Sequence, residues 1–247
     1  MKIEELYYSN LVSKQDNGRK NDDFIQEENA KIILEKFRDF FSYENFSKSK
    51  RKSFDVNNRD GIAFPDNITD MNERQLESYF YKCQMENPIG KFILYQIYRK
   101  ERKGEYLEGE KDKFRGPIDL LAVKGEELIV VELKDYDNNE NLIRAALEAY
   151  TYSAQFDLEL FKADFCSKAS KKSDVDKELI KNVKRIRPVV LIPKRDETSI
   201  KCQGKAYKTA LNTKYGKNPN IKELIKNVLC VEVYAFDKTG KIEQIVL

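Results

Sequence analysis

Two carboxylates and one ammonium group are the residues whose types and spacing best suit catalysis in this sequence. Asp119 lies in one short apolar run, Glu132 lies in the next, and Lys134 follows two positions later. Carboxylate oxygens are ligands that Mg²⁺ prefers, and a bound Mg²⁺ keeps several water molecules. Such an ion can lower the pKa of a water and offset charge on a phosphoryl group, while Lys134 orients or deprotonates that water or stabilises the transition state. The pattern therefore favours metal-assisted phosphodiester hydrolysis.

The sequence contains no histidine, which excludes Ser-His-Asp and Cys-His nucleophile pairs and histidine-ligated zinc. The four cysteines have no CxxC spacing, as expected for reduced thiols in the cytoplasm. The first ten residues do not have the pattern of a signal peptide, and no apolar run approaches the roughly 18 residues of a membrane span. We therefore expect a cytoplasmic protein with no membrane partner.

The chemistry-bearing residues must be positioned by a β-hairpin. Residues 118–123 and 128–133 are rich in branched apolar side chains, and Gly125-Glu126 between them suits a two-residue turn. In the register of that turn, Asp119 lies opposite Glu132. Lys134 shares the face of Glu132 because side chains alternate along a strand. Continuous apolar character on both faces predicts a central hairpin in a sheet covered on both sides, and hence an α/β fold.

The flanking elements follow from periodicity and from capping residues. A helix is predicted over residues 23–41, and a second begins with Asp70 as N-cap and Glu73 three positions later. Residues 91–99 suit either a strand or a helix. After the hairpin we expect a helix capped by Asn138 or Asn139 and running through 161, a strand at 189–192, a helix near 221–228, and strands at 230–236 and 242–246.

The charges of the chain are divided between two blocks. Residues 61–160 carry a net charge of −7 and residues 161–220 carry +10. A basic stretch of this kind is expected of a protein that binds the phosphate backbone, although a solvated lysine-rich surface would give the same count. The candidate phosphate contacts are Lys171, Lys172, Lys184, Arg185, Arg187, Lys194 and Arg195.

At the hairpin the sequence resembles the PD-(D/E)XK nuclease superfamily. Pro117-Ile118-Asp119 corresponds to the PD element and Glu132-Leu133-Lys134 to the ExK element. The string GPIDLLAVKGEELIVVELK is similar to the branch that includes archaeal-type single-strand and mismatch nucleases. The resemblance covers residues 72–156 and is followed by a compatible order of elements.

The resemblance implies a restriction-endonuclease-like core, with a central mixed β-sheet flanked by helices, over residues 61–247. Residues 1–60 would be a mainly helical N-terminal extension. It further implies that Asp119 and Glu132 bind Mg²⁺, for which Mn²⁺ can substitute, and that the Leu133 carbonyl is a further ligand. Lys134 would be catalytic. The additional acid of the upstream helix would be Glu73 or Glu77.

The helix after the hairpin departs from the family pattern. Many relatives have a glutamine about four residues before a tyrosine, whereas Ala146 occupies that place before Tyr150. The auxiliary polar role then falls to Arg144, Glu148 or Gln155, or is absent. The expected activity is that of a Mg²⁺-dependent DNA endonuclease, and a homodimer is compatible with it.

Four alternatives stay open. The protein could be an RNA endonuclease, or a non-catalytic module of the same fold that binds nucleic acid or another protein. The charged residues at the strand ends could form a structural salt-bridge cluster. Glu73 could be the N3 partner of a capping box instead of a ligand.

Overall fold

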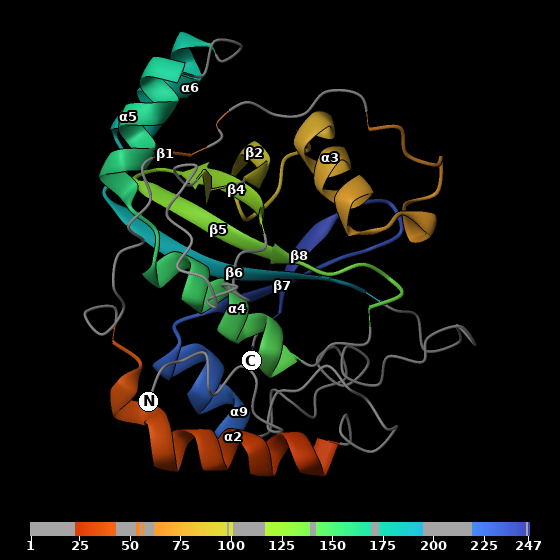
Figure 1. Ribbon diagram of the computed structural model, residues 1–247. Helices are drawn as coiled ribbons and strands as arrows, with labels where there is room; N and C mark the ends of the chain where they lie inside the picture. Colours follow the sequence, from red (N-terminus) through yellow and green to blue (C-terminus); the bar gives the residue numbers. More distant parts are fainter. Residues whose placement is uncertain are drawn as a thin grey trace, which may run out of the picture.

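The computed structural model describes residues 23–42, 53–54, 56, 62–97, 99–100, 117–138, 142–168, 173–194, 219–245 and 247. Within this part of the chain a six-stranded sheet has the order β2-β4-β5-β6-β7-β8 (Figure 1). Its strands are β2 (Lys91–Ile97), β4 (Ile118–Lys124), β5 (Glu127–Leu133), β6 (Arg185–Pro193), β7 (Glu232–Phe236) and β8 (Ile242–Ile245). Two short strands, β1 (Ser53–Phe54) and β3 (Arg99–Lys100), pair separately.

The main sheet is mixed. Strands β2, β4 and β5 are antiparallel, β5, β6 and β7 are parallel, and β8 returns antiparallel to β7. A parallel neighbour requires a crossover, which the helices between β5 and β6 supply. The prediction of an α/β protein with a central mixed sheet flanked by helices is confirmed. Residues 91–97, which suited either state, form a strand.

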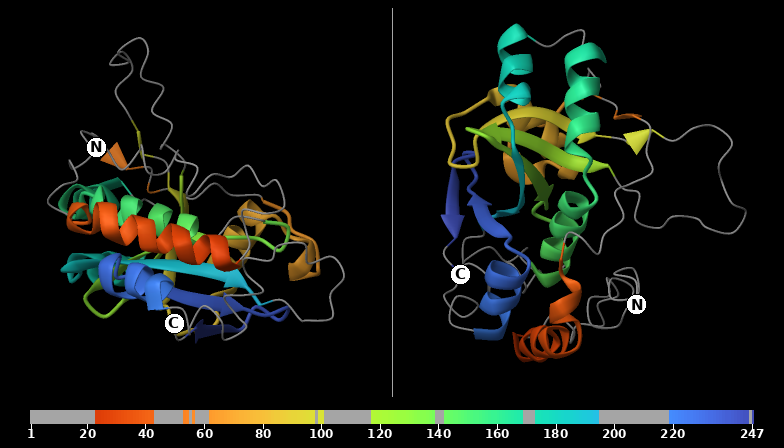
Figure 2. Two further views of the ribbon diagram at one scale, coloured as in Figure 1. Left: turned by 90° about the horizontal axis from the view of Figure 1, so that it is seen from below. Right: turned by 90° about the vertical axis from the view of Figure 1, so that its left-hand side faces the viewer.

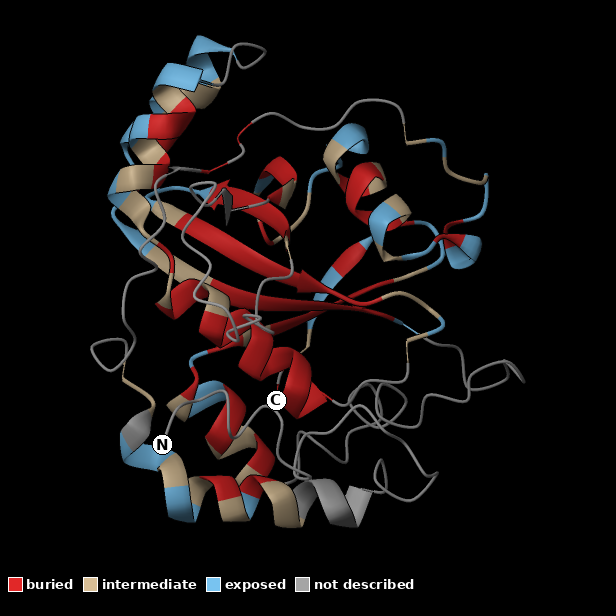
Figure 3. Ribbon diagram, viewed as in Figure 1, coloured by how far each residue is buried: buried red, intermediate tan, exposed pale blue. Residues whose placement is uncertain are grey.

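The predicted hairpin register is also confirmed. Lys124 pairs with Glu127, and the same register continues to Leu120 opposite Val131. Gly125 occupies the first turn position with φ +58°, a left-handed conformation that favours glycine. Both strands are buried along almost their whole length (Figure 3), as expected for a hairpin in the centre of a covered sheet.

Helices cover both faces of the sheet. Helix α3 (Glu73–Cys83) packs through Leu76 and Phe80 on the face that contains Leu133. Helix α4 (Leu142–Ala154) covers the opposite face, where it contacts β5 and β6. The remaining helices are α5 (Leu158–Lys168), α6 (Asp174–Lys181), α9 (Pro219–Lys222) with the π-helical η4 (Glu223–Val228), and the short 3-10 turn η3 (Ile68–Asp70).

One predicted cap is wrong, and the position of another lies partly outside the described residues. The N-cap of α3 is Asn72, whose side chain accepts a hydrogen bond from the Gln75 amide, and Gln75 completes the capping box. Asp70 lies in η3 instead, so Glu73 is not a capping residue. Helix α4 is described from Leu142, and the Asn138 side chain donates a hydrogen bond to Glu73, while Asn139 lies outside the described residues. The predicted helix through residue 161 is interrupted between α4 and α5.

Residues 23–42 are largely helical and pack on the rest of the molecule. Helix α2 (Asp23–Phe37) continues into η1 (Arg38–Phe40), close to the predicted helix at 23–41. Ala30 and Ile33 join the apolar cluster of α4 and α9. Figure 2 shows α2 and α9 side by side, at the end of the molecule opposite to α5 and α6. No helix in the described ranges is long and apolar enough to cross a membrane.

Candidate active site

Asp119 and Glu132 come together where β4 begins and β5 ends. The carboxylate Oδ2 of Asp119 accepts a hydrogen bond from the backbone amide of Leu133, at 2.8 Å. Both carboxylates are buried, and Asp119 has the larger exposed fraction, 9%. Each raises the electrostatic cost of ionising the other, because the charge of Glu132 raises the pKa of Asp119. The two acids of the predicted motif therefore share one site.

Lys134 lies between carboxylates from three elements. Its Nζ is 2.5 Å from Glu132 Oε1, 3.1 Å from Glu148 Oε2 on α4, and 4.0 Å from Glu73 Oε1 on α3. The Lys134 backbone amide donates to the Leu191 carbonyl at 3.0 Å, which continues the parallel pairing of β5 with β6. Lys134 is thus buried, and both its ammonium group and its backbone amide are bound by neighbouring groups.

Both acids of α3 approach this site, and they differ in depth. Glu77 is 3% exposed, whereas the Glu73 side chain is 36% exposed. Glu73 Oε1 accepts a hydrogen bond from Asn138 at 2.7 Å, and the Glu73 amide donates to Asp135 at 3.2 Å. The charges of Glu77 and Glu73 both raise the pKa of Asp119, so both lie within electrostatic reach of it. The buried Glu77 is the better candidate ligand.

On α4 the structure brings two of the three auxiliary candidates into the site. Glu148 and Arg144 are both buried, and Arg144 Nη2 lies 3.7 Å from Glu148 Oε1. Gln155 lies just after the end of the helix, seven residues beyond Glu148, or about 10 Å along the axis. The auxiliary polar group next to Lys134 is therefore a carboxylate.

The buried acids have raised pKa values. Burial is the main cause for Asp119, whose pKa is well above its usual value, with the charges of Glu132 and Glu77 adding to the shift and Lys134 opposing it. Burial followed by the charge of Glu73 raises the pKa of Glu77 to about 9. Burial raises the pKa of Glu148 to about 8. Ionising these groups together is costly unless another positive charge joins them.

The charges of the site suit a divalent cation. Its four buried carboxylates belong to Glu77, Asp119, Glu132 and Glu148, and its two buried cations to Lys134 and Arg144. The fully ionised set has two negative charges in excess, which Mg²⁺ would balance, and the donors are oxygens of the kind that Mg²⁺ binds. The residues that could hold it are Asp119, Glu132 and Glu77, with the Leu133 carbonyl.

The side chains are arranged around Lys134. Within the described ranges, no group of three or more acidic, cysteine or histidine side chains is positioned to hold a metal ion. The ammonium contact of Glu132 provides a physical reason, since one carboxylate oxygen of that residue is directed at Lys134 Nζ. Metal binding would require Glu132 to exchange this contact for the cation.

No family model, curated protein or solved structure matches this chain. The function proposed below is therefore inferred from the chain's own residues.

The described basic candidates are all ion-paired, and most lie far from the carboxylates. Arg185 and Arg187 pair with Glu127 at the start of β5, and Lys184 pairs with Glu126. Glu127 and Glu132 are five residues apart on β5, a separation of about 16 Å. These three basic residues therefore do not line the candidate site. Arg187 also pairs with Glu232.

Lys194 is placed differently. It directly follows β6, at the same end of the sheet as Lys134, and its Nζ lies 2.5 Å from Glu243. Its backbone amide donates to the Phe236 carbonyl at 2.6 Å. Lys171, Lys172 and Arg195 lie outside the described residues. Of the described candidates, Lys194 alone follows the strand ends that carry the carboxylates.

Sequence reasoning missed three residues that support the acids. Asp135 and Asn138 bind Glu73, and Gln96 on β2 hydrogen-bonds to Glu77. Asp135 and Asn138 lie within four residues of the end of the ExK motif, so their position after the strand could have marked them as site residues. No sequence signal marked Gln96, because its place beside the acids depends on a bulge in β2.

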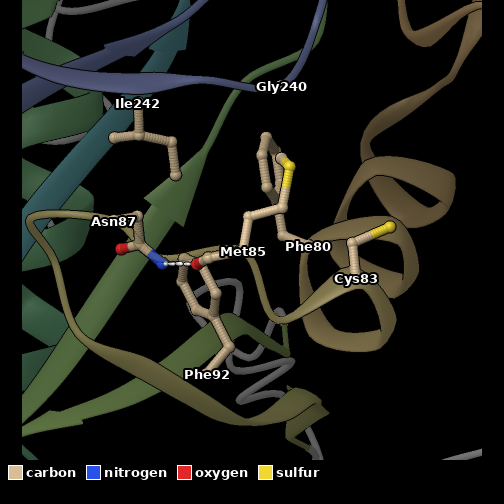
Figure 4. Close-up of a pocket in the computed structure, with 7 residues that line it drawn as sticks. All are labelled: Phe80, Cys83, Met85, Asn87, Phe92, Gly240 and Ile242. Carbon is tan, nitrogen blue, oxygen red and sulfur yellow. Dashed lines mark hydrogen bonds between the residues drawn. The ribbon is translucent and has the colours of Figure 1, made fainter.

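A small, mainly apolar hollow lies elsewhere (Figure 4). Its lining includes Phe80 and Cys83 from α3, Phe92 from β2 and Gly240 from the β7–β8 turn. Cys83 ends α3 and Glu73 begins it, so the hollow is about 15 Å from the first acid along the helix axis. It is not part of the carboxylate site.

Proposed function

We propose that this protein is a metal-dependent deoxyribonuclease of the PD-(D/E)XK type, with a restriction-endonuclease-like core. The observation that carries the proposal is the convergence of Asp119, Glu132 and Lys134 at one end of a buried hairpin, with Glu77 reaching them from α3. The mixed sheet, with α3 before the hairpin and α4 after it, supports the same assignment.

The burial of these charges supports a functional role. Taking several carboxylates out of water costs several kcal/mol for each ion unless the geometry compensates. Here burial, with the charges of neighbouring carboxylates adding to it, leaves Asp119 and Glu77 with raised pKa values. Buried acids with raised pKa values are typical of a site that binds a cation or a substrate.

In the proposed mechanism, Asp119 and Glu132 would hold the cation and Glu77 would complete the acidic set. Bound Mg²⁺ would supply Lewis acidity, lowering the pKa of a water and offsetting charge on the phosphoryl group. Lys134 then leaves Glu132 and directs its ammonium at the attacking water or at the negative charge of the transition state. Glu148 keeps Lys134 within the site during this exchange, because it binds the same Nζ.

A second candidate is a non-catalytic nucleic-acid-binding or protein-interaction module with this fold. The closed contact of Lys134 with Glu132 and Glu148 favours it, since that arrangement also describes a structural salt-bridge cluster. The raised pKa values of the buried acids weigh against this second candidate, because a purely structural cluster gains nothing from two buried carboxyl groups in excess of its cations.

Cleavage assays would test the proposal directly. Single-stranded, duplex and branched DNA and RNA would each be incubated with the protein and either Mg²⁺ or Mn²⁺. We expect metal-dependent cleavage of DNA that Glu132→Gln and Lys134→Ala reduce at least about 100-fold. Preferential cleavage of RNA would make the protein a ribonuclease that uses the same site.

The matched control is Glu127→Gln. Glu127 lies on the same strand as Glu132 and is ion-paired with arginines, yet it lies at the other end of the sheet. This variant should cut at the wild-type rate. Absence of cleavage by the wild-type protein, or equal cleavage by Glu132→Gln, would refute catalysis and leave the binding module.

A further inference from the structure

A bulge in β2 determines which residue lies opposite Asp119. Phe92 pairs with Ala122, but Leu94 pairs with Leu121, so Ile93 is an extra residue in the ladder. Beyond the bulge, Tyr95 and Ile97 pair with Leu120 and Ile118, so interpolation between these two pairs places Gln96 level with Asp119. Without the extra residue, Tyr95 would lie there. Bulges commonly redirect a side chain next to an active site.

Gln96 has an unusual backbone conformation for a strand residue. Its φ is +49°, in the left-handed region that is unfavourable for a residue with a Cβ. The other non-glycine residues with positive φ in the described ranges are Gln84, at the C-cap of α3, and Cys230, which precedes β7. Among these non-glycine residues with positive φ, Gln96 is the one that lies inside a strand. Such conformations persist where the surroundings impose them, often at functional sites.

The side chain of Gln96 contacts the buried acid of α3. A hydrogen bond with Gln96 opposes the rise in the pKa of Glu77, as donation from an amide to a carboxylate would. Among the described residues, no protein group hydrogen-bonds to Glu77 Oε2 or to Gln96 Oε1, and both atoms are buried. Each side chain therefore has one oxygen engaged by no described protein group.

The register extends this relation across the sheet. Gln96 lies opposite Asp119 on β4, and Asp119 lies opposite Glu132 on β5 by continuation of the hairpin register. Glu77 approaches from α3 and is close enough for the charge of Glu132 to act on it. Gln96, Asp119 and Glu132 therefore lie at successive positions across three strands, and Glu77 lies within electrostatic reach of both acids.

We propose that Gln96 is a positioning residue of the metal site, which holds the Glu77 carboxylate toward Asp119 and Glu132 and offers Oε1 to a water of the cation. This inference rests on the proposed function. The bulge and the left-handed backbone would then both serve to place the amide of Gln96 beside the acids. Without the bulge, the Tyr95 ring would lie there.

The test compares Gln96→Gly with Gln84→Gly. Glycine adopts the left-handed conformation readily, so in both variants the relief of backbone strain opposes the entropy cost of glycine. Gln84 has a φ of +46° but lies at the C-terminal end of α3, away from the acids. Mn²⁺ affinity would be measured by titration without substrate, and the Mg²⁺ concentration for half-maximal cleavage would be measured separately.

For Gln96→Gly we expect about a tenfold loss of Mn²⁺ affinity and a similar rise in the Mg²⁺ requirement, with a melting temperature close to wild type. Gln84→Gly should change neither metal measurement. Unchanged Mn²⁺ affinity in Gln96→Gly, in a protein that binds metal and cleaves DNA, would overturn this inference alone. A wild-type protein that neither binds Mn²⁺ nor cleaves would overturn it together with the proposed function.

Discussion

The carboxylate of Asp119 binds the backbone amide of Leu133, with Oδ2 2.8 Å from the nitrogen. The backbone pairing of β4 with β5 ends at Leu120 opposite Val131, so this side-chain bond joins the strands just beyond their last paired residues. One carboxylate therefore holds the hairpin together at the position where it is proposed to bind metal. The two roles can be separated by substitution.

Asp119→Asn and Asp119→Ala should differ in stability and agree in activity. Asparagine can still accept the hydrogen bond from Leu133, whereas alanine leaves that buried amide unpaired, at a cost of about 1–3 kcal/mol. Both remove the charged ligand and should reduce cleavage at least about 100-fold. Thermal unfolding and cleavage rates check this expectation. Wild-type cleavage by Asp119→Asn would show that its charge is not needed.

Replacing Lys134 with methionine should make stability depend strongly on Mg²⁺. The change removes the ammonium that Glu132 and Glu148 share, and breaking a buried ion pair costs about 3–5 kcal/mol. A divalent cation would replace the lost charge, so Mg²⁺ should raise the melting temperature of Lys134→Met more than that of wild type. Equal increments in calorimetry would argue against a cation site beside Glu132.

Glu77→Gln should stabilise the metal-free protein in a pH-dependent manner. The pKa of Glu77 is raised to about 9 in the fold, so the wild-type protein loses stability as pH rises from about 4.5 toward 9, while the amide loses none. We expect a gain that vanishes near pH 4.5 and grows by at most about 1.4 kcal/mol for each pH unit between there and about 9. Denaturation across this pH range would measure it. A gain that is constant with pH would contradict the role of ionisation.

Substitution of basic residues should distinguish the two ends of β6. Lys194→Ala should weaken DNA binding and reduce the salt dependence by about one phosphate contact, because Lys194 follows the strand ends that carry the acids. Arg185→Ala should leave binding unchanged, since Arg185 lies at the other end and pairs with Glu127. Salt titrations of both variants would compare them. The opposite result would place the DNA along the start of β6.

The hairpin and its charged end were predictable because their signals are local. A glycine at the first turn position fixes the pairing, and the period of two residues then determines the faces of Asp119, Glu132 and Lys134. The approach of an acid from the upstream helix followed from the family resemblance. These features need no knowledge of distant contacts.

Other features depended on choices that local patterns do not distinguish. Asp70 with Glu73 and Asn72 with Gln75 both satisfy a capping-box pattern, and only the second pair caps α3. The bulge at Ile93 changes the residue level with Asp119, but it cannot be detected in the sequence because the residues on either side of it are apolar as well. The charge count located a basic segment along the chain and could not show that β6 begins at Arg185, which places its arginines far from the acids.

The packing of α2 on α9 has a consequence for the order in which the protein can fold during synthesis. Ile33 of α2 is completely buried in a cluster that also contains Ile221 of α9 and Leu224 of η4. When α2 leaves the ribosome, the residues that will cover it are still untranslated. Its apolar face therefore stays exposed to water or bound to a chaperone until they are made. The hairpin and α3 contact one another within a short span of sequence and can assemble earlier. The carboxylate cluster can therefore form before the helix at residues 23–37 is secured.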